Sequence, residues 1–446
     1  MSRKYLNNLA YLLCFLFITI RINAQDFNPP EWSYDKAIYE VNLRQFTKQG
    51  NIKEFQKHLP RLKELGADIL WFMPIHPIGE KNRKGTLGSY YSVKDYKAVN
   101  PEFGTIEEFK SMVEMIHKMG MYVIIDWVAN HTAWDNHWII EHPEFYTQDS
   151  LGNIISPNPD WTDVADLNFD NKELRKEMID ALKFWVEECD IDGYRCDVAG
   201  MVPTEFWIEA RTELEKIKNV FMLAEWDTPE VHKAFDMTYD WDFHRIMNGI
   251  AKKEKSAKDI IEHIEQDEKE FPANAFRMQF TSNHDENTWN GTEFERLGDG
   301  AETFAVLTCL IPDMPLVYTG QEAGNDKRLS FFEKDTVDWK VDKMFNIYSK
   351  MFQLKKKNQA LRNGKLGGEM DYINSSDEQN IFSFTRSFGN DKVLAIFNLS
   401  DKHINTELTG ENLTGSYKNY FTGKLETFST KESFELNPWE YRIYTK

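Results

Sequence analysis

The sequence contains little cysteine, only one long apolar run and comparatively little positive charge. Four of its 446 residues are cysteine, too few for the disulfide framework that stabilises small secreted domains. Lys and Arg together number 53 against 72 Asp and Glu, a net charge of −19. A surface of this sign repels nucleic acid and anionic membranes, so neither is an expected partner. A neutral substrate is expected instead.

The long apolar run lies at the amino end, at residues 9–20. It follows Arg3 and Lys4 and leads to Ala24, the pattern of a secretory signal peptide cleaved near that alanine. The run is shorter than the ~18 residues that indicate a membrane-spanning helix, and no later window reaches that length. We therefore expect an exported protein, periplasmic or extracellular, without a membrane partner after cleavage. A retained N-terminal anchor is the alternative.

Three cysteines remain after cleavage, an odd number for an exported protein. No disulfide framework is therefore expected. Cys196 stands between Arg195 and Asp197 on a predicted strand. Because successive side chains of a strand point to opposite faces, its thiol should point away from these two residues and into the core.

Much of the chain alternates β-rich runs with amphipathic helical stretches, the pattern of βα units. A capping box at Thr105 and Glu108 predicts the start of one of these helices. Eight strands close a parallel barrel, which needs ~250 residues and leaves room here for a second core. We expect strands near residues 36–46, 67–73, 122–125, 191–194, 220–223, 235–239, 277–280 and 316–318, and helices that include 52–65, 172–188, 246–270 and 303–311.

Two regions depart from this alternation. Periodicity is lost over about residues 130–170, which predicts a functional excursion or a small subdomain. After residue 364 short β-rich runs alternate with turns, typical of an antiparallel domain. The predicted organisation is a signal peptide at 1–24, an α/β catalytic (β/α)8 TIM barrel at 25–360 and a C-terminal β-sandwich at 361–446.

Four polar stretches follow four of the predicted strands. They contain Asp126 to His131, the pair Arg195 and Asp197, Glu225, and Asn283-His284-Asp285. The carboxyl ends of barrel strands share one rim, so we expect these groups to converge on one pocket. Tryptophans are frequent beside the four stretches, as at Trp226. Most aromatic side chains belong to the core, but several in loops favour a surface that stacks on sugar rings.

Cleavage of an acetal between two sugars needs a proton for the leaving oxygen and stabilisation of positive charge at C1. Asp197, Glu225 and Asp285 are three carboxylates at strand ends. Arg195 should lie on the same side of its strand as Asp197 and lower the pKa of that aspartate, which suits a nucleophile. Glu225 lies between Ala224 and Trp226, an apolar setting that raises a carboxyl pKa and suits a general acid.

A single strand-end acid more often caps the following helix than takes part in catalysis. Four such stretches together favour a catalytic site. In residues 126–131, 193–197, 225 and 283–285 the sequence resembles the conserved regions of the α-amylase superfamily, glycoside hydrolase family 13. The similarity extends through residues 88–96, 166–168 and 320–322, and so covers most of 32–360.

The resemblance implies a role for each matching residue. Asp197 would be the nucleophile, Glu225 the acid/base and Asp285 a stabiliser of the transition state. Asp126 would support Arg195 and the strand end. The residues expected to contact the sugar are Tyr91, His131, Arg195, Trp226 and His284.

The same family often binds calcium between the barrel and the excursion after the third strand. Asn130 and Asp166 match two of those ligand positions, and their oxygen donors suit a hard cation. Many calcium-dependent amylases have Lys-His shortly after the nucleophile, where this chain has Gly200 and Met201. Only a backbone carbonyl could serve there. A structural calcium ion is thus an open expectation, and no organic cofactor is expected.

Three functions fit these residues. The first is a retaining hydrolase of α-1,4 bonds in starch, maltodextrins or related α-glucans. The second is an α-glucan transglycosidase or branching enzyme, which uses the same catalytic residues but passes the glucan to a sugar hydroxyl. The third is a glucan-binding relative without catalysis, which the presence of all three carboxylates disfavours.

Overall fold

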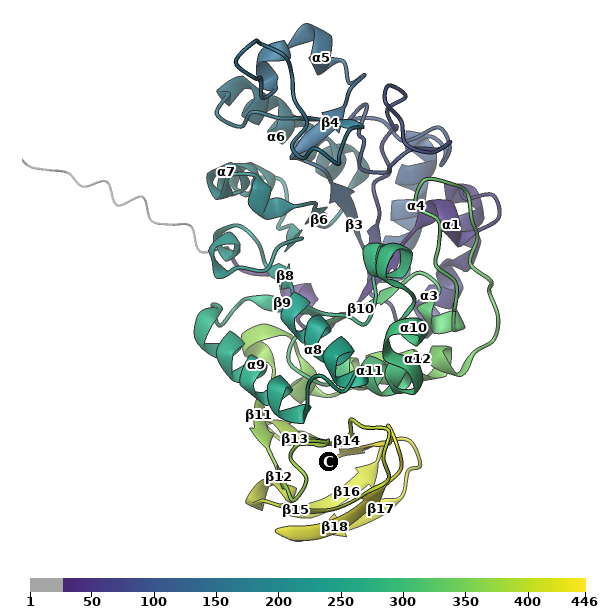
Figure 1. The fold of residues 1–446 in the computed structure, drawn as a ribbon, viewed down its shortest axis with the longest axis vertical. Helices are drawn as coiled ribbons and strands as arrows, with labels where there is room; N and C mark the ends of the chain where they lie inside the picture. The colour runs from purple at the N-terminus through teal and green to yellow at the C-terminus, as the bar shows by residue number, and fades with distance from the viewer. Residues whose placement is uncertain (1–26) are drawn as a thin grey trace, which may run out of the picture.

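The computed structural model describes residues 27–446, in which a barrel is joined to a C-terminal β-domain (Figure 1). Eight parallel strands close the barrel in the order β1-β10-β9-β8-β7-β6-β3-β2. The predicted fold class is therefore confirmed. The barrel strands are β1 (Ile38–Val41), β2 (Ile69–Phe72), β3 (Tyr122–Trp127), β6 (Gly193–Cys196), β7 (Phe221–Ala224), β8 (Met237–Tyr239), β9 (Phe276–Gln279) and β10 (Met314–Tyr318).

Each barrel strand is buried on both faces, as its apolar sequence predicts. Within β3, Ile124 fills the barrel interior, whereas Val123 and Ile125 pack in the core outside it. Cys196 belongs to that outer core, so the predicted direction of its thiol is confirmed. Asp126 lies opposite Arg195 in the β3–β6 ladder, which brings two of the predicted site residues together.

Helices surround the barrel strands. The capping box of Thr105 and Glu108 begins α4, as predicted. The α-helices are α1 (Leu43–Phe46), α2 (Ile52–Phe55), α3 (Leu59–Leu65), α4 (Ile106–Lys118), α5 (Trp138–Glu141), α6 (Lys172–Cys189), α7 (Thr204–Leu214), α8 (Trp241–Ala251), α9 (Ala257–Glu270), α10 (Glu293–Leu297), α11 (Ala301–Thr308) and α12 (Lys343–Lys357).

Two helices that were predicted as continuous are interrupted. The stretch 246–270 divides into α8 and α9, because Lys253 takes the left-handed conformation (φ 65°) and Ser256 then caps a new helix. The stretch 52–65 divides into α2 and α3 around the 3-10 turn Gln56–His58. In both cases the apolar spacing continues across the break, so periodicity alone could not show the interruption.

The excursion after β3 has its own small sheet. Strands β4 (His131–Ala133) and β5 (Val164–Asp166) pair antiparallel and bring His131 opposite Asp166. The predicted excursion is therefore present, and it starts directly at the rim of the barrel.

The C-terminal domain consists of two antiparallel sheets with strand orders β11-β13-β14-β19-β16-β17 and β12-β15-β18. Residues of both sheets, such as Leu394 and Leu408, share one apolar core. Arg386 of β13 ties the domain to the barrel by donating to the carbonyl of Ile311 (3.0 Å). The strands are β11 (Glu369–Tyr372), β12 (Asn374–Ser375), β13 (Ile381–Phe388), β14 (Asp391–Asn398), β15 (Ile404–Thr409), β16 (Gly415–Asn419), β17 (Leu425–Phe428), β18 (Lys431–Leu436) and β19 (Tyr441–Thr445).

The predicted signal peptide lies outside the described residues. Within residues 27–446, no helix combines the length and apolar character needed to cross a membrane. Cys189, Cys196 and Cys309 are buried and free. The expectation that no disulfide links these three cysteines is confirmed.

Candidate active site

A cavity of about 450 Å³ opens at the carboxyl ends of the barrel strands. Its lining includes the carboxylates of Asp197, Glu225 and Asp285, together with Tyr91 and His131. The three acids come from the ends of β6 and β7 and from the loop after β9. The structure thus brings residues almost 90 positions apart in sequence into one site, as the barrel topology predicts.

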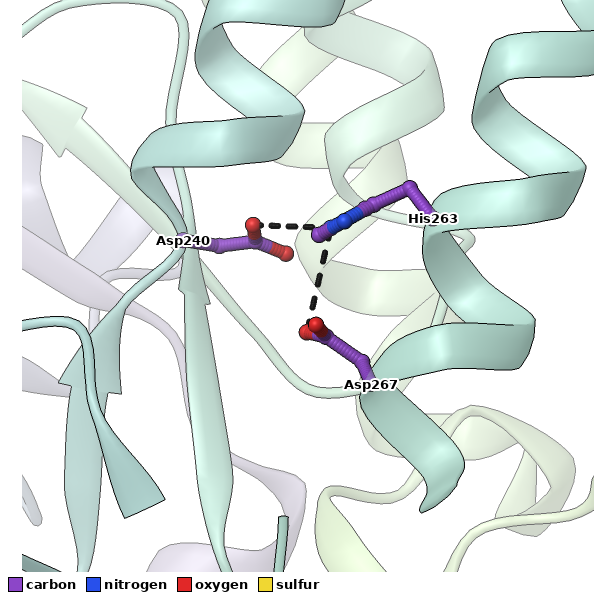
Figure 2. Close-up of side chains that lie close together, drawn as sticks. All are labelled: Asp240, His263 and Asp267. Carbon is purple, nitrogen blue, oxygen red and sulfur yellow. Dashed lines mark ion pairs between the residues drawn. The ribbon is translucent and has the colours of Figure 1, made fainter. Parts of the chain in front are cut away.

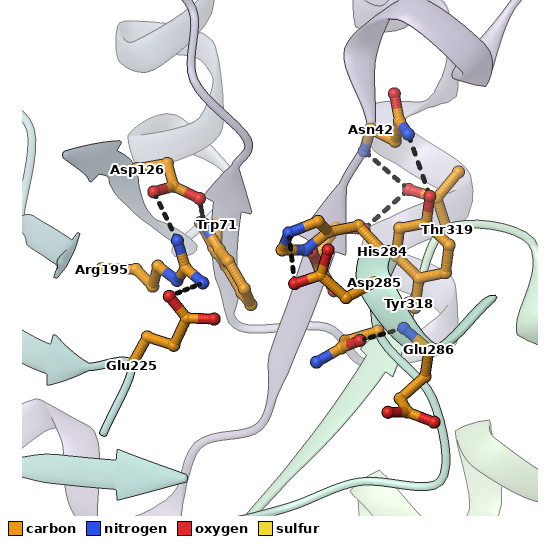
Figure 3. Close-up of polar contacts among 12 residues, drawn as sticks. Asn42, Trp71, Asp126, Arg195, Glu225, His284, Asp285, Glu286, Tyr318 and Thr319 are labelled. Carbon is orange, nitrogen blue, oxygen red and sulfur yellow. Dashed lines mark hydrogen bonds and ion pairs between the residues drawn. The ribbon is translucent and has the colours of Figure 1, made fainter. Parts of the chain in front are cut away.

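Arg195 is the common partner of Asp126, Asp197 and Glu225, and Figure 3 shows its contacts with Asp126 and Glu225. Its side chain is fully buried, and its Nη1 lies 2.8 Å from Asp126 Oδ1 and 3.1 Å from Asp197 Oδ1. Its Nη2 lies 3.0 Å from Glu225 Oε2. The carboxylates of Asp197 and Glu225 therefore contact the two terminal nitrogens of one guanidinium, which holds them near each other.

The expected pKa of Asp197 needs correction. Burial and the neighbouring Glu225 carboxylate raise the pKa of Asp197 well above its ordinary value, although Arg195 acts in the opposite direction. The prediction considered only the guanidinium, because the sequence shows neither the burial nor the closeness of Glu225. Burial also raises the pKa of Asp126 to about 6.

Glu225 is positioned by the backbone as well as by Arg195. Its Oε2 accepts the N–H of Val198 (2.8 Å). Val198 directly follows Asp197 and has φ +36° and ψ +47°, a left-handed conformation that is strained for a β-branched residue. This strained turn fixes the position of Glu225 relative to Asp197.

Asp285 forms the opposite side of the site and is paired with His284. His284 Nε2 lies 3.3 Å from Asp285 Oδ2, and Trp289 Nε1 donates to Asp285 Oδ1 (3.3 Å). Burial alone would raise the pKa of Asp285, but His284 outweighs it and the pKa is lowered. Asp285 is therefore an ionised acceptor, as expected of a group that binds sugar hydroxyls.

Glu40, at the end of β1, is a site residue that the sequence did not reveal. Its Oε1 lies 2.5 Å from His284 Nδ1, and the glutamate is completely buried. Burial alone would lower the pKa of His284, but Asp285 and Glu40 raise it well above its ordinary value. His284 is therefore an imidazolium whose Nε2 donates to Tyr91 Oη (2.7 Å), which in turn donates to Asp126 (3.1 Å).

This chain of contacts predicts the effect of Glu40→Gln. Loss of the Glu40 charge lowers the pKa of His284, so the imidazolium deprotonates at a lower pH. We expect the alkaline limb of the kcat/KM profile to move toward lower pH by about one unit or more. The matched control is Glu322→Gln, another fully buried glutamate, which pairs with Arg61 at 2.8 Å and does not line the cavity. An unchanged profile in Glu40→Gln would show that His284 does not depend on this carboxylate.

Of the residues predicted to contact the sugar, some line the cavity and others do not. Tyr91 and His131 line the cavity, and burial lowers the pKa of His131 to about 4, so its ring is neutral. Trp226 is not among the residues that line the cavity. Its indole packs against Gly200, where an added Cβ would lie 2.0 Å from the ring. The sequence placed Trp226 beside Glu225 but could not show which way its ring turns.

Aromatic side chains form much of the remaining cavity wall. Trp161 comes from the excursion, Trp289 from the loop after β9, and Phe331 and Phe332 from the segment before α12. Trp289 is 52% exposed, so its ring is available for stacking on a sugar. The two phenylalanines were missed because they lie in a stretch without periodicity, and only their adjacency was visible in the sequence.

Asn130 directly precedes β4, and Asp166 is the last residue of β5, which pairs with β4. Asn130 is buried and accepts the N–H of Leu167 at its carbonyl (3.1 Å). Asp166 is half-buried, and burial raises its pKa. Within residues 27–446 no cationic side chain forms an ion pair with Asp166. A half-buried carboxylate without an ion-pair partner suits a hard cation.

Two family models match the chain. The model of the α-amylase catalytic domain matches residues 28–161 and 158–343, and the model of the α-amylase C-terminal all-β domain matches residues 372–440. Together these matches cover both the barrel and the β-domain.

Individual proteins are similar over nearly the whole chain. An α-amylase of Dictyoglomus thermophilum is 24% identical over 90% of this chain and 91% of its own length. The structure of a noncanonic maltogenic α-amylase from Thermotoga neapolitana superposes with a TM-score of 0.85 at 29% identity, covering 92% of this chain and 98% of the other. The structure of an α-amylase from Lactobacillus plantarum superposes with a TM-score of 0.83 at 30% identity, covering 92% of this chain and 99% of the other.

Proposed function

Because the chain belongs to the α-amylase family, we propose that it hydrolyses α-1,4-glucosidic bonds of starch, maltodextrins or related α-glucans with retention of configuration. It is a glycoside hydrolase, and the residues of the cavity provide the groups that this reaction needs. The observation that carries the proposal is the position of Asp197 and Glu225 on the two terminal nitrogens of Arg195.

In the first step, Glu225 protonates the leaving glycosidic oxygen while Asp197 attacks C1 and the bond to the departing glucan breaks. A β-linked glycosyl ester on Asp197 results. Asp285 accepts hydrogen bonds from sugar hydroxyls as positive charge develops at C1. Arg195 neutralises the surrounding carboxylates, and Asp126 fixes its orientation.

In the second step, Glu225 as a carboxylate removes a proton from water, which attacks C1 and releases Asp197. Two inversions at C1 return the α configuration. A sugar hydroxyl in place of water would give transfer. The catalytic groups are the same for both reactions, so the acceptor decides the product.

Products from maltoheptaose separate these outcomes. We expect only shorter maltooligosaccharides, because water is the acceptor in a hydrolase. Chromatography with mass detection after short incubation would measure them. Longer or branched products as the major species would show that the enzyme is a transglycosidase and not a hydrolase. Absence of any reaction would favour a glucan-binding protein.

We also propose a calcium ion at Asn130 and Asp166. Calcium would supply the positive charge that Asp166 otherwise lacks, and would join the excursion to the rim of the barrel. A metal that binds only the native state stabilises it, by about 2.7 kcal/mol at 100 times its Kd.

Chelation should therefore lower Tm by about 2–4 °C or more. Differential scanning calorimetry with EDTA, followed by addition of calcium alone, tests this. Calcium should restore Tm in the wild type but not in Asp166→Asn. A Tm that is insensitive to both treatments would mean that hydrogen bonds alone hold this interface.

Export is the last part of the proposal. The basic residues, the apolar run and Ala24 at the amino end support a cleaved signal peptide. An extracellular or periplasmic glucan hydrolase would act on polymers too large to enter the cell. Fractionation of cells with N-terminal sequencing of the mature chain tests this part.

A further inference from the structure

Outside the active site, three ionisable side chains converge between α9 and the end of β8 (Figure 2). Asp240 follows β8, and His263 and Asp267 lie one turn apart on α9, so both face Asp240. The ligand atoms that these residues offer all lie within 4.8 Å of one another. His263 Nε2 is 2.9 Å from Asp240 Oδ1 and 3.7 Å from Asp267 Oδ2.

These separations suit a small cation. Zinc binds imidazole nitrogen and carboxylate oxygen at ~2.0–2.2 Å, so tetrahedral ligands lie roughly 3.3–3.5 Å apart. The two distances from His263 Nε2, 2.9 and 3.7 Å, bracket this value.

His263 lies between two carboxylates, and although burial acts to lower its pKa, its contacts with Asp240 and Asp267 raise it. Its Nε2 is buried and has no hydrogen-bond partner within residues 27–446, although Asp240 Oδ1 is at ion-pair distance. His263 as a whole is only 9% exposed, so water does not readily replace the missing partner.

Gln279 supplies an independent sign of a missing ligand. It is 3% exposed and, together with Asp240, His263 and Asp267, lines a second cavity of about 420 Å³. Its Nε2 donates to Asp240 Oδ2 (3.0 Å), which turns Oδ1 toward His263. Its Oε1 is buried and has no partner in the described part of the chain. A water molecule bound to a metal would be a donor for this carbonyl, and the hydrogen bond to Asp240 is typical of residues behind a metal ligand.

The charges of the cluster are also unbalanced. Arg277 contacts three carboxylates, those of Asp227 (2.5 Å), Asp267 (2.8 Å) and Asp240 (3.6 Å). Even a protonated His263 would leave one negative charge unmatched among these groups. A divalent cation beside a neutral His263 would balance them. Burial of uncompensated charge is costly, so a bound cation would stabilise the arrangement.

Existing hydrogen bonds leave room for the metal. Asp240 Oδ1 accepts the N–H of Phe243 (3.0 Å), and Asp267 Oδ2 accepts Nε of Arg277 (2.8 Å). Each carboxylate oxygen has two lone pairs, so each retains one acceptor position. Arg277 would then orient Asp267 and need not be displaced.

We propose that Asp240, His263 and Asp267 bind a divalent transition-metal ion of the zinc type, with water from the cavity as a fourth ligand. The ion would clip α9 to the end of β8. The adjoining residue Tyr239 accepts a hydrogen bond from Arg195 Nε (3.1 Å), so the clip would also support the wall of the active site.

Metal binding by the full chain tests this proposal. The protein is stripped with EDTA, dialysed into buffer with excess calcium and titrated with zinc chloride by calorimetry. We expect about one equivalent of tight zinc binding and a rise in Tm on zinc addition. Cobalt(II) should give the visible absorption of a tetrahedral complex. The excess calcium saturates the proposed site at Asn130 and Asp166, so that zinc binding at that site does not contribute to the titration.

His263→Gln should lose this equivalent, the cobalt spectrum and the rise in Tm. His403→Gln is the matched control, because His403 pairs with Glu435 at 3.0 Å on the surface of the β-domain. It should bind zinc as the wild type does. No tight binding by the wild type, or full binding by His263→Gln, would overturn the proposal. If His263→Gln does not fold, the anomalous peak of a zinc-soaked wild-type crystal decides, and a peak away from His263 contradicts the site.

Discussion

Asp197→Asn is expected to lower kcat on maltoheptaose by about 10⁵-fold or more, because an amide cannot form the glycosyl ester. This loss corresponds to about 7 kcal/mol of transition-state stabilisation. Folding should be preserved. Burial and Glu225 raise the pKa of Asp197 in the folded protein. Ionisation of Asp197 therefore costs more free energy in the folded protein than in the unfolded chain, and this cost lowers stability at pH values above the ordinary pKa of aspartate. Tm at neutral pH should therefore stay the same or rise.

Asp163→Asn is the matched control for this substitution. Asp163 also lines the active-site cavity and pairs with Lys84 at 3.1 Å. It is not one of the carboxylates that pair with Arg195. We expect less than about a 10-fold change in kcat, as for a polar group at the edge of a site. Activity of Asp197→Asn within this range would show that Asp197 is not the nucleophile.

The second large effect is expected at Glu225→Ala. Removal of the proton donor should lower kcat on natural glucans by about 10²–10⁴-fold. An aryl α-glucoside with a good leaving group needs no protonation, so its first step should be affected much less. Its second step still lacks the base that activates water, and the glycosyl enzyme should accumulate.

Azide should restore turnover of the aryl glucoside in Glu225→Ala. The anion needs no general base, and it fits the space that the carboxylate leaves at Val198 and Arg195. The product should be the α-glycosyl azide, since two inversions precede its release. A β-azide, or rescue in Asp197→Ala alone, would mean that the two roles are exchanged or that the enzyme inverts.

Much of this architecture could be predicted from the sequence, because the relevant patterns are local. The β-rich runs before Asp126, Asp197 and Glu225 indicated strand ends, and a parallel barrel places all strand ends at one rim. The division between α8 and α9 could not be predicted, because it depends on one left-handed residue, Lys253, within continuous apolar spacing.

The parts of the site that were missed depend on contacts across the barrel. Glu40 and His284 are 244 residues apart, and only closure of β1 onto β10 brings their elements together. The pKa of Asp197 depends on burial, which a motif does not encode. The direction of the Trp226 ring depends on the space beside Gly200. Sequence motifs identified the acids, whereas their electrostatics required the three-dimensional arrangement.

The central claim is that Asp197 and Glu225 act by double displacement on α-glucans. Proton NMR of the first sugar released from maltoheptaose tests it most directly, provided that spectra are taken before mutarotation. Retention predicts that the α-anomer of the new reducing end appears first and the β-anomer grows in later. Initial formation of the β-anomer would contradict the account, because water would then have attacked C1 directly.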